Sequence, residues 1–372
     1  MTGNGISKRS LLGIALNAMV VIAFLAGCAA PATEVATEAP EATEPPEAEA
    51  TEPPVTEPAE PLEFAVVLQA IGIPFFSALE RGAIQAGHDF GVHVEVVGPP
   101  LHDPERQIAM FEAYVQRGVD GIVVGAPVPV WDTTINAAID QGMIVLTTNS
   151  DAPDSRRIAG WQQDFEDTGR IMGQTLVELM GEEGVVGMGW CVSGAVPLVR
   201  RLDGFSEVIS QYPGITTIGP IDVGDDASRA YEGWSTLIST NPEMTGTFGL
   251  CATDPQAAGE VAQDLARDDL IVIGYDLQPV TLELIRDGWV DMALGQAPYL
   301  QGYLPIMALA NYFQNGTPLP EGLVPMPMEI VTADNAADYI PRETDSHAER
   351  VWYSNWLCEN YPNDYPAELC TD

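Results

Sequence analysis

The chain has 372 residues, of which 46% are hydrophobic and 19% are charged; this is too apolar for a disordered protein and long enough for two lobes of about 150 residues each. Its 15 Lys and Arg residues against 54 Asp and Glu residues give a formal net charge of −39. That charge excludes sequence-independent nucleic-acid binding, which depends on cations that neutralise phosphates, and it disfavours anionic lipid headgroups as partners of the folded part.

The first 28 residues have the pattern of an export signal. Lys8 and Arg9 precede an apolar run from Leu11 to Leu25, which is too short for a comfortable transmembrane span. The stretch that ends at Cys28 resembles the lipobox of bacterial lipoproteins, whose cysteine becomes the lipidated N-terminus. We therefore expect residues 1–28 to be a lipoprotein signal peptide with a lipid on Cys28; the alternative is an ordinary signal peptide with an incidental cysteine.

Residues 29–62 are built from loose repeats of Glu, Ala, Thr and Pro and contain no aromatic or basic residue. Such a composition cannot form a core, and we expect a disordered, extended tether.

From Phe64 onward, short apolar strands alternate with amphipathic helices. Continuous Val and Ile runs such as residues 121–124 are typical of strands that are buried on both faces, as in parallel sheets. The predicted strands are 64–68, 92–97, 121–124, 144–147, 185–189, 216–218, 247–250, 270–273 and 292–294.

About five strand–helix units precede residue 164 and another five follow it, more than one open sheet of ordinary width holds. The pattern predicts an α/β protein with two similar lobes, each a parallel sheet flanked by helices. Ligands of such sheets bind beyond the carboxyl ends of the strands, so the expected site is the cleft between the lobes.

Several chemistries lack their motifs. The glycines of residues 184–189 do not have dinucleotide-binding spacing, and the four histidines form neither an HExxH motif nor part of a GxSxG serine site. We expect no cofactor, no metal site and no catalysis. Carboxylates are plentiful, so a glycoside hydrolase with an acid pair stays as an alternative.

The residues after the predicted strands combine aromatic faces with short polar side chains. This is what a polyhydroxylated ring needs, because its C–H faces lie against aromatic rings and its hydroxyls both donate and accept hydrogen bonds. These residues are Phe75, Phe76, Asn149, Asp151, Thr253, Asp254, Tyr275, Asp276 and Gln296.

Residues 64 to about 336 resemble the ribose/galactose-type periplasmic sugar-binding proteins, the solute receptors of ABC importers. Six segments in the family's order carry the resemblance: Ile73-Pro-Phe-Phe-Ser-Ala-Leu-Glu-Arg-Gly82, Thr147-Thr-Asn-Ser-Asp-Ala-Pro153, Arg201-Leu-Asp-Gly-Phe205, Ala252-Thr-Asp254, Val272-Ile-Gly-Tyr-Asp276 and Gln296-Ala-Pro-Tyr-Leu-Gln-Gly302.

The resemblance implies a type I periplasmic binding protein fold with a three-strand hinge near residues 163–164, 296–297 and 326–329. The N-terminal lobe would comprise 63–163 plus 297–327, the C-terminal lobe 164–296 plus 328–345, and an extension would follow over 346–372. Phe75 and Phe76 would sandwich the sugar. The implied hydroxyl-binding residues are Asn149, Arg201, Thr253, Asp276 and Gln296, and further candidates are Asp151, Gln163, Asp225 and Tyr275.

The departures from the family pattern bear on the ligand. Ile73, Ala126, Asn149 and Asp225 stand where ribose binders carry other residues. The ribose contact set is incomplete, so a different pentose or hexose, a deoxy sugar, a polyol or a furanosyl signal molecule all stay open.

Four cysteines follow Cys28, and none has CxxC spacing. An even number in an exported chain permits disulfides. Cys358 and Cys370 are expected to staple the C-terminal extension, whereas Cys191 and Cys251 either pair or are buried thiols.

The function that these observations favour is a monomeric substrate-binding lipoprotein on the outer face of the cell membrane. It would capture a monosaccharide or similar solute and deliver it to the permease of an ABC transporter. A ligand sensor that feeds a chemoreceptor or kinase is the alternative among binding proteins. A repressor of related fold is disfavoured, because an export signal and a tether occupy the place of a helix-turn-helix.

Overall fold

The computed structural model describes residues 61–370. The predicted signal peptide, the lipidation of Cys28, the tether up to residue 60 and the last two residues lie outside this range. In the described range, we find no helix with the length and apolar character that a membrane crossing requires.

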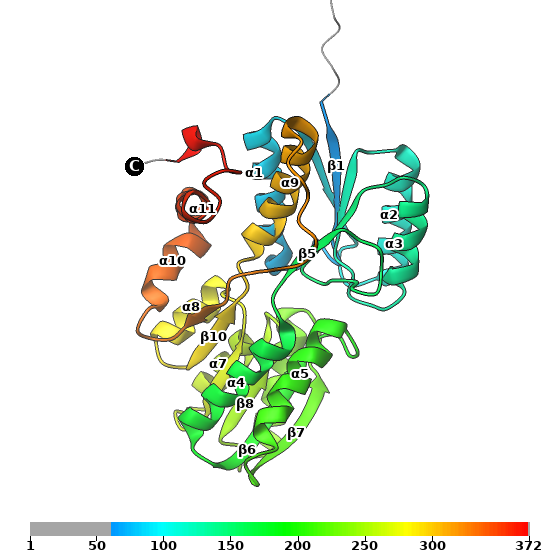
Figure 1. Ribbon diagram of the computed structural model, residues 1–372. Helices are drawn as coiled ribbons and strands as arrows, with labels where there is room; N and C mark the ends of the chain where they lie inside the picture. The colour runs from blue at the N-terminus through cyan, green and yellow to red at the C-terminus, as the bar shows by residue number, and fades with distance from the viewer. Residues whose placement is uncertain (1–60, 371–372) are drawn as a thin grey trace, which may run out of the picture. The chain divides into compact units, whose positions relative to one another are not determined.

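The N-lobe is built on a six-stranded sheet of order β11-β5-β4-β3-β1-β2 in which every neighbouring pair is parallel. Helices α1 and α9 cover one face of this sheet and α2 and α3 cover the other (Figure 1). The strands are β1 (Glu63–Val67), β2 (His93–Val97), β3 (Gly121–Val124), β4 (Val145–Thr148), β5 (Ala159–Gln162) and β11 (Gly322–Pro325). The helices are α1 (Pro74–Phe90), α2 (Pro104–Arg117), α3 (Trp131–Asp140) and α9 (Pro298–Asn315).

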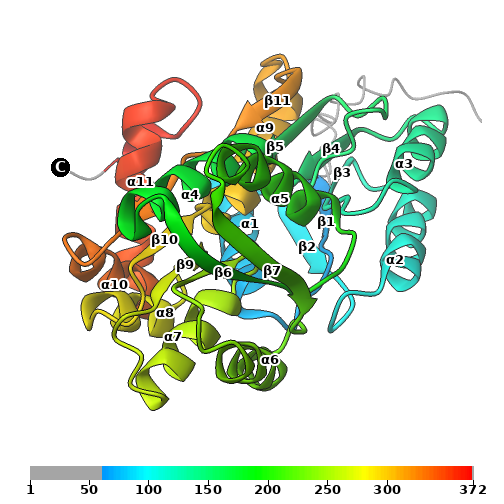
Figure 2. The ribbon, with the colours of Figure 1, turned by 90° about the horizontal axis from the view of Figure 1, so that it is seen from below.

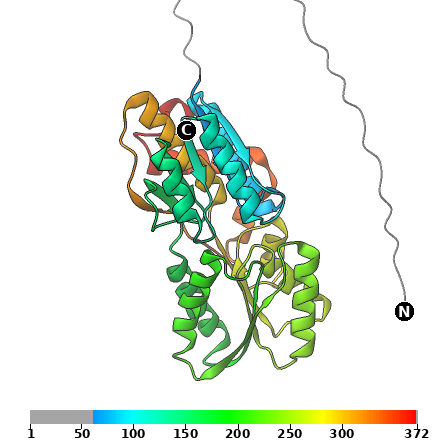
Figure 3. The same cartoon turned by 90° about the vertical axis from the view of Figure 1, so that its right-hand side faces the viewer.

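The C-lobe repeats this plan with a sheet of order β12-β10-β9-β8-β6-β7, parallel except for the β10–β12 pair. Figures 2 and 3 show its helices on both faces of the sheet, with α4 and α5 opposite α6 and α7. The strands are β6 (Glu183–Trp190), β7 (Gly214–Asp222), β8 (Gly246–Gly249), β9 (Ile271–Tyr275), β10 (Met292–Gly295) and β12 (Glu329–Val331). The helices are α4 (Phe165–Met180), α5 (Val196–Ile209), α6 (Ala227–Thr240), α7 (Asp254–Asp264), α8 (Pro279–Arg286) and α10 (Ala336–Thr344).

The chain crosses between the two sheets three times: between β5 and α4, between β10 and α9, and between β11 and β12. In both sheets the first strand of the lobe lies between its second and third strands, which is a doubly wound order. The prediction of an α/β fold with two similar lobes and a three-strand hinge is confirmed. All nine predicted strands occur, and β5, β11 and β12, which were not predicted, lie beside the crossings.

Close approach of helix pairs sets the position of the cleft residues. A Cβ atom on Gly169 of α4 would collide with the carbonyl oxygen of Arg201 in α5, and one on Gly204 of α5 would collide with the carbonyl oxygen of Glu166. Only glycine permits this contact between the two backbones. The pairing holds the start of α5, and with it Arg201, at the end of the C-lobe sheet.

The last helix, α11 (Ser346–Asn360), packs on the N-lobe although α10 before it belongs to the C-lobe. Tyr353 and Leu357 of α11 join the N-lobe core, where the Tyr353 ring stacks on Tyr299 with centroids 4.6 Å apart. Arg81 of α1 forms a bidentate pair with Glu349. The joint at Asp345 is therefore a fourth connection between the lobes, next to the three hinge crossings.

Disulfides join Cys191 to Cys251 and Cys358 to Cys370. The first connects the segments that follow β6 and β8 in the C-lobe. The second closes the chain after α11.

Candidate ligand-binding site

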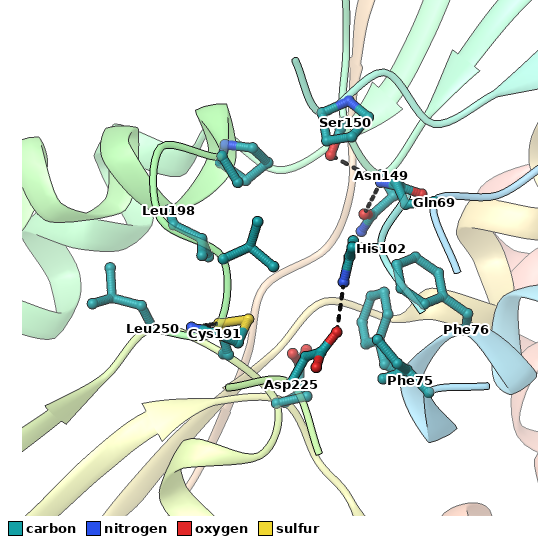
Figure 4. Close-up of a pocket in the computed structure, with 18 of the residues that line it drawn as sticks. Gln69, Phe75, Phe76, His102, Asn149, Ser150, Cys191, Leu198, Asp225 and Leu250 are labelled. Carbon is teal, nitrogen blue, oxygen red and sulfur yellow. Dashed lines mark hydrogen bonds and ion pairs between the residues drawn. A yellow bond between two sulfur atoms is a disulfide. The ribbon is translucent and has the colours of Figure 1, made fainter. Parts of the chain in front are cut away.

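A cavity of about 190 Å³ lies between the lobes, at the carboxyl ends of the strands. All seven leading sequence candidates line it, together with Asp225. Figure 4 labels Phe75, Phe76, Asn149 and Asp225 among them. This placement follows from the topology, because the carboxyl ends of parallel strands meet at one edge of each sheet and the two edges face each other.

The aromatic pair lies in the first turn of α1, which begins with Pro74. Phe75 and Phe76 are 6% and 5% exposed, and their rings meet edge to face at 87° with centroids 5.1 Å apart. The two rings form a corner of the cavity instead of two parallel surfaces. A sugar ring therefore does not fit between them as a sandwich, and the geometry offers one aromatic face and one aromatic edge.

A network of amides forms the N-lobe side of the cavity. Gln69 donates through Nε2 to Asn149 Oδ1 at 2.9 Å and to Ser150 Oγ at 3.0 Å, and Asn149 donates through Nδ2 to Gln301 Oε1 at 3.0 Å. Asn149 adopts a positive φ of 61°, a conformation that asparagine tolerates better than most residues. These bonds fix the orientation of the Gln69 and Asn149 side chains before any ligand binds.

Arg201 is buried under the C-lobe side of the cavity. Its guanidinium carbon lies 3.8 Å from the centroid of the Tyr275 ring, and Nη1 donates to the carbonyl oxygen of Leu250 at 2.8 Å. Burial lowers the pKa of Arg201 and raises the pKa of Tyr275 to about 12. Stacking and the backbone acceptor hold the guanidinium in one plane, while its Nε has no partner among the described residues.

Asp276 and Gln296 form a buried pair at the hinge. Gln296 donates through Nε2 to Asp276 Oδ1 at 2.7 Å, and the positive φ of 76° at Asp276 turns its side chain just after β9. Burial raises the pKa of Asp276 to about 6, against the opposing effects of Arg201 and of the Gln296 hydrogen bond. A buried carboxylate whose ionised form costs free energy favours a ligand that donates hydrogen bonds to it.

Thr253 lies at the start of α7, in the segment after β8. Neighbouring Asp254 fixes this segment, since its carboxylate accepts from the Cys251 backbone N–H at 2.7 Å and from Trp234 Nε1 at 3.0 Å. The Cys191–Cys251 disulfide ties the same segment to the one after β6. The loop that carries Thr253 is thus held from two sides.

Two polar contacts join the lobes at the cavity. His102 Nδ1, after β2, lies 3.2 Å from Asp225 Oδ2, after β7 (Figure 4). The Val196 backbone N–H donates to the carbonyl oxygen of Pro127 at 3.2 Å. The lobes therefore touch across the cleft, as a closed binding protein requires.

Three sequence candidates do not line the cavity. Asp151 turns to Arg157, which binds both carboxylate oxygens. Gln163 donates to the carbonyl oxygens of Gly295 and Pro327, so it fastens the three hinge crossings to one another. Tyr275 is fully buried beneath Arg201. These residues support the site without facing it.

Sequence reasoning missed other lining residues, including Gln69, His102, Ser150 and Phe165. Gln69 and His102 come within a few residues of the ends of β1 and β2, so the strand-end rule that found Asp276 could also have found them. Ser150 lies beside the predicted Asn149.

Residues that line this cavity carry a large share of the buried polar atoms without a hydrogen-bond partner. Among residues 61–370, eight buried side-chain nitrogen or oxygen atoms have no hydrogen-bond partner, and four of the eight belong to lining residues. Buried polar groups in native proteins are nearly always paired, and each exception costs about 1–3 kcal/mol. The four atoms are Gln69 Oε1, Arg201 Nε, Thr253 Oγ1 and Gln296 Oε1.

Known proteins with similar sequences or structures are binding proteins. The xylose/arabinose-binding protein XylF of Sulfolobus acidocaldarius is 24% identical over 284 residues, which covers 72% of this chain and 70% of XylF. The ribose import binding protein RbsB of Bacillus subtilis is 24% identical over 249 residues, covering 65% of this chain and 79% of RbsB. An ABC transporter solute binding protein of Burkholderia graminis, solved in complex with D-arabinose, superposes with a TM-score of 0.71 at 27% identity, covering 76% of this chain and 99% of the other.

Two mainly parallel sheets, joined by a three-crossing hinge with a cavity between them, define a two-lobed binding protein of the type I periplasmic class. The model of the periplasmic binding protein domain matches residues 64–317, and the chain belongs to that family. The relatives bind solutes and are not enzymes, so the glycoside hydrolase alternative has no support.

Proposed function

We propose that this protein captures a monosaccharide or a similar polyhydroxylated solute in the cavity between its lobes and delivers it to a membrane permease of an ABC transporter. The ligand contacts would be Phe75, Phe76, Asn149, Arg201, Thr253, Asp276 and Gln296, with Asp225 and Gln69 beside them. The relatives, a xylose/arabinose-binding protein and a ribose import binding protein, support this ligand class.

The observation that carries the proposal is that four residues lining one cavity each have a buried polar atom with no partner among the described residues. These atoms include donors and acceptors, and they lie near the carboxylate of Asp276 and the rings of Phe75 and Phe76. A sugar hydroxyl both donates and accepts, so one small ring with several hydroxyls offers partners to both kinds of atom.

Thermal-shift screening of the purified protein against monosaccharides, polyols and nucleosides tests the ligand class. A ligand at 100 times its dissociation constant stabilises the folded state by about 2.7 kcal/mol, which raises the melting temperature. We expect a sugar or polyol to give the largest rise. A set of sugars and polyols that all leave the melting temperature unchanged would contradict the proposal.

Thr253→Val then tests the position of the site with little disturbance of the fold, because the Thr253 hydroxyl has no hydrogen-bond partner among residues 61–370 that the variant would lose. We expect the affinity for the best sugar to fall about 2- to 10-fold, the value of one neutral hydrogen bond. Thr281→Val is the matched control: its hydroxyl is also buried and unpartnered, but Thr281 does not line the cavity. Equal affinities of the two variants would place the sugar elsewhere.

Delivery and anchoring need separate tests. We expect cells that lack the protein to lose uptake of the identified sugar, and we expect Cys28→Ser to release the protein from the membrane fraction. Normal uptake in the absence of the protein would favour the sensor role, and a Cys28→Ser variant that stays with the membrane would contradict lipid anchoring.

A further inference from the structure

Apart from Arg201, Thr253 and Asp225, the C-lobe side of the cavity consists mainly of apolar groups. We call this surface the apolar wall. It comprises the Cys191–Cys251 disulfide, Val192, Ala195, Leu198 and Leu250. Figure 4 shows Leu198, Leu250 and Cys191 on the opposite side of the cavity from Gln69, Asn149 and the two phenylalanines.

The backbone of the apolar wall offers few hydrogen bonds to a ligand, because the protein itself uses its polar groups. The carbonyl oxygen of Leu250 accepts from Arg201 Nη1 at 2.8 Å, and the Cys191 N–H donates to Cys251 Sγ at 3.0 Å. The carbonyl oxygen of Val192 accepts from the Ala195 N–H, and the carbonyl oxygen of Ala195 accepts from the Leu198 N–H.

The N-lobe and hinge sides of the cavity add hydrogen-bonding groups to their apolar residues. There the Gln69 and Gln296 side chains each keep an unpartnered carbonyl oxygen, and Asp276 presents a buried carboxylate. A bound ligand therefore meets hydrogen-bonding groups of the N-lobe and the hinge, together with Arg201 and Thr253 of the C-lobe, but finds few partners where it lies against the apolar wall. A sugar with hydroxyls all around its ring would place one of them against a surface that cannot pair with it.

We propose that the preferred ligand is a deoxy sugar, in which a hydrogen atom replaces one hydroxyl, so that a methyl group in place of the parent's hydroxymethyl group faces the apolar wall. This inference rests on the proposed function and narrows it. A methyl group there gains contact with apolar side chains, whereas the hydroxymethyl group of the parent sugar leaves its hydroxyl unpaired.

Calorimetric titration of matched pairs tests this preference: D-fucose against D-galactose, L-fucose against L-galactose, L-rhamnose against L-mannose, and 6-deoxy-D-glucose against D-glucose. In the pair with the tightest binding, we expect the deoxy member to bind roughly 10- to 100-fold more tightly. The inference would be overturned if a hydroxylated sugar bound as tightly as its deoxy partner. It would also be overturned if the tightest ligand were a fully hydroxylated sugar outside these pairs. Either result would leave the proposed function, sugar binding, standing. Failure of every sugar would instead contradict the proposed function.

A variant of the wall provides the second readout. Val192→Thr replaces a methyl group by a hydroxyl of similar size on a half-buried residue, so we expect the fold to persist. We expect Val192→Thr to lower the preference for the deoxy sugar, measured as the ratio of the two affinities in the tightest-binding pair, by about fivefold or more relative to the wild-type protein. Val199→Thr, on α5 but outside the cavity lining, is the control and should leave the ratio unchanged. A Val192→Thr variant that weakens both sugars equally would show a structural role only and overturn the inference.

Discussion

Replacing Asp276 by asparagine should stabilise the ligand-free protein and weaken ligand binding at the same time. Asparagine matches aspartate in shape, tolerates the positive φ of 76°, and keeps an oxygen that accepts from Gln296. The substitution therefore removes the charge and little else. Alanine would be a poorer choice, because it would strain the backbone and leave Gln296 without its acceptor.

The stability gain follows from the pKa of Asp276, which burial raises from 3.8 to about 6. The folded state favours the protonated form of Asp276. Relative to the ionised form, protonated Asp276 therefore contributes its full stabilisation below pH 3.8, the pKa of the unfolded state, and this stabilisation is lost as the pH rises through about 6, the pKa of the folded state. At pH 8 the ionised carboxylate costs the folded state about 3 kcal/mol, from about two pKa units. At pH 4.5 the cost is only about 1 kcal/mol.

Urea denaturation of both proteins at pH 8 and pH 4.5, followed by tryptophan fluorescence, measures this difference. We expect Asp276→Asn to be the more stable protein at pH 8 and to lose about 2 kcal/mol of that advantage at pH 4.5. Its affinity for the ligand should fall about five- to tenfold, because a neutral oxygen replaces a charged acceptor. A difference in unfolding free energy that is the same at both pH values would refute the burial argument, and an unchanged affinity would remove Asp276 from the ligand contacts.

Three further perturbations test other parts of the structure. Changing Cys191 and Cys251 together to serine should lower the free energy of unfolding by about 4 kcal/mol, because their disulfide closes a loop with a sequence separation of 60; an unchanged urea midpoint would contradict this. Arg201→Met should keep an unbranched side chain at this buried position but remove the guanidinium that lies over Tyr275, and it should weaken ligand binding roughly 10- to 100-fold in calorimetry; an affinity equal to wild type would show that the guanidinium does not touch the ligand. Tyr353→Ala should cost about 3–5 kcal/mol in urea denaturation, whereas a loss below about 1 kcal/mol would mean that α11 is not part of the N-lobe core.

The site residues that follow strand ends were predicted best from the sequence. Asn149, Thr253 and Asp276 each follow a strand whose Val, Ile or Phe residues are plain in the sequence, and parallel sheets gather such ends at one edge. The short strands β5 and β11 were not recognised, because four residues beside a crossing carry too little periodicity.

The hydrogen-bond partners of the site side chains could not be predicted from the sequence. Asp151 and Asn149 are two residues apart, yet Arg157 draws the former away while Gln69 holds the latter in the cavity. The contact between His102 and Asp225 joins loops 123 residues apart in different lobes. Such choices depend on packing between lobes, which no local pattern records.

The C-terminal extension shows the same limit. Its composition gave no reason to place α11 on the N-lobe while α10 stays with the C-lobe. Arg342 of α10, which pairs with Glu329 and lies over the rings of Trp352 and Tyr353, provides the contact between the two helices. That contact depends on residues brought together from three separate segments.

A crystal structure of the protein with its tightest-binding sugar would test the central claim most directly. We predict one sugar in the cavity between the lobes, with oxygen atoms within hydrogen-bond distance of Arg201, Asp276 and Gln296 and a ring face against Phe75 or Phe76. A sugar bound at another surface, with these side chains still contacting only one another, would contradict the account.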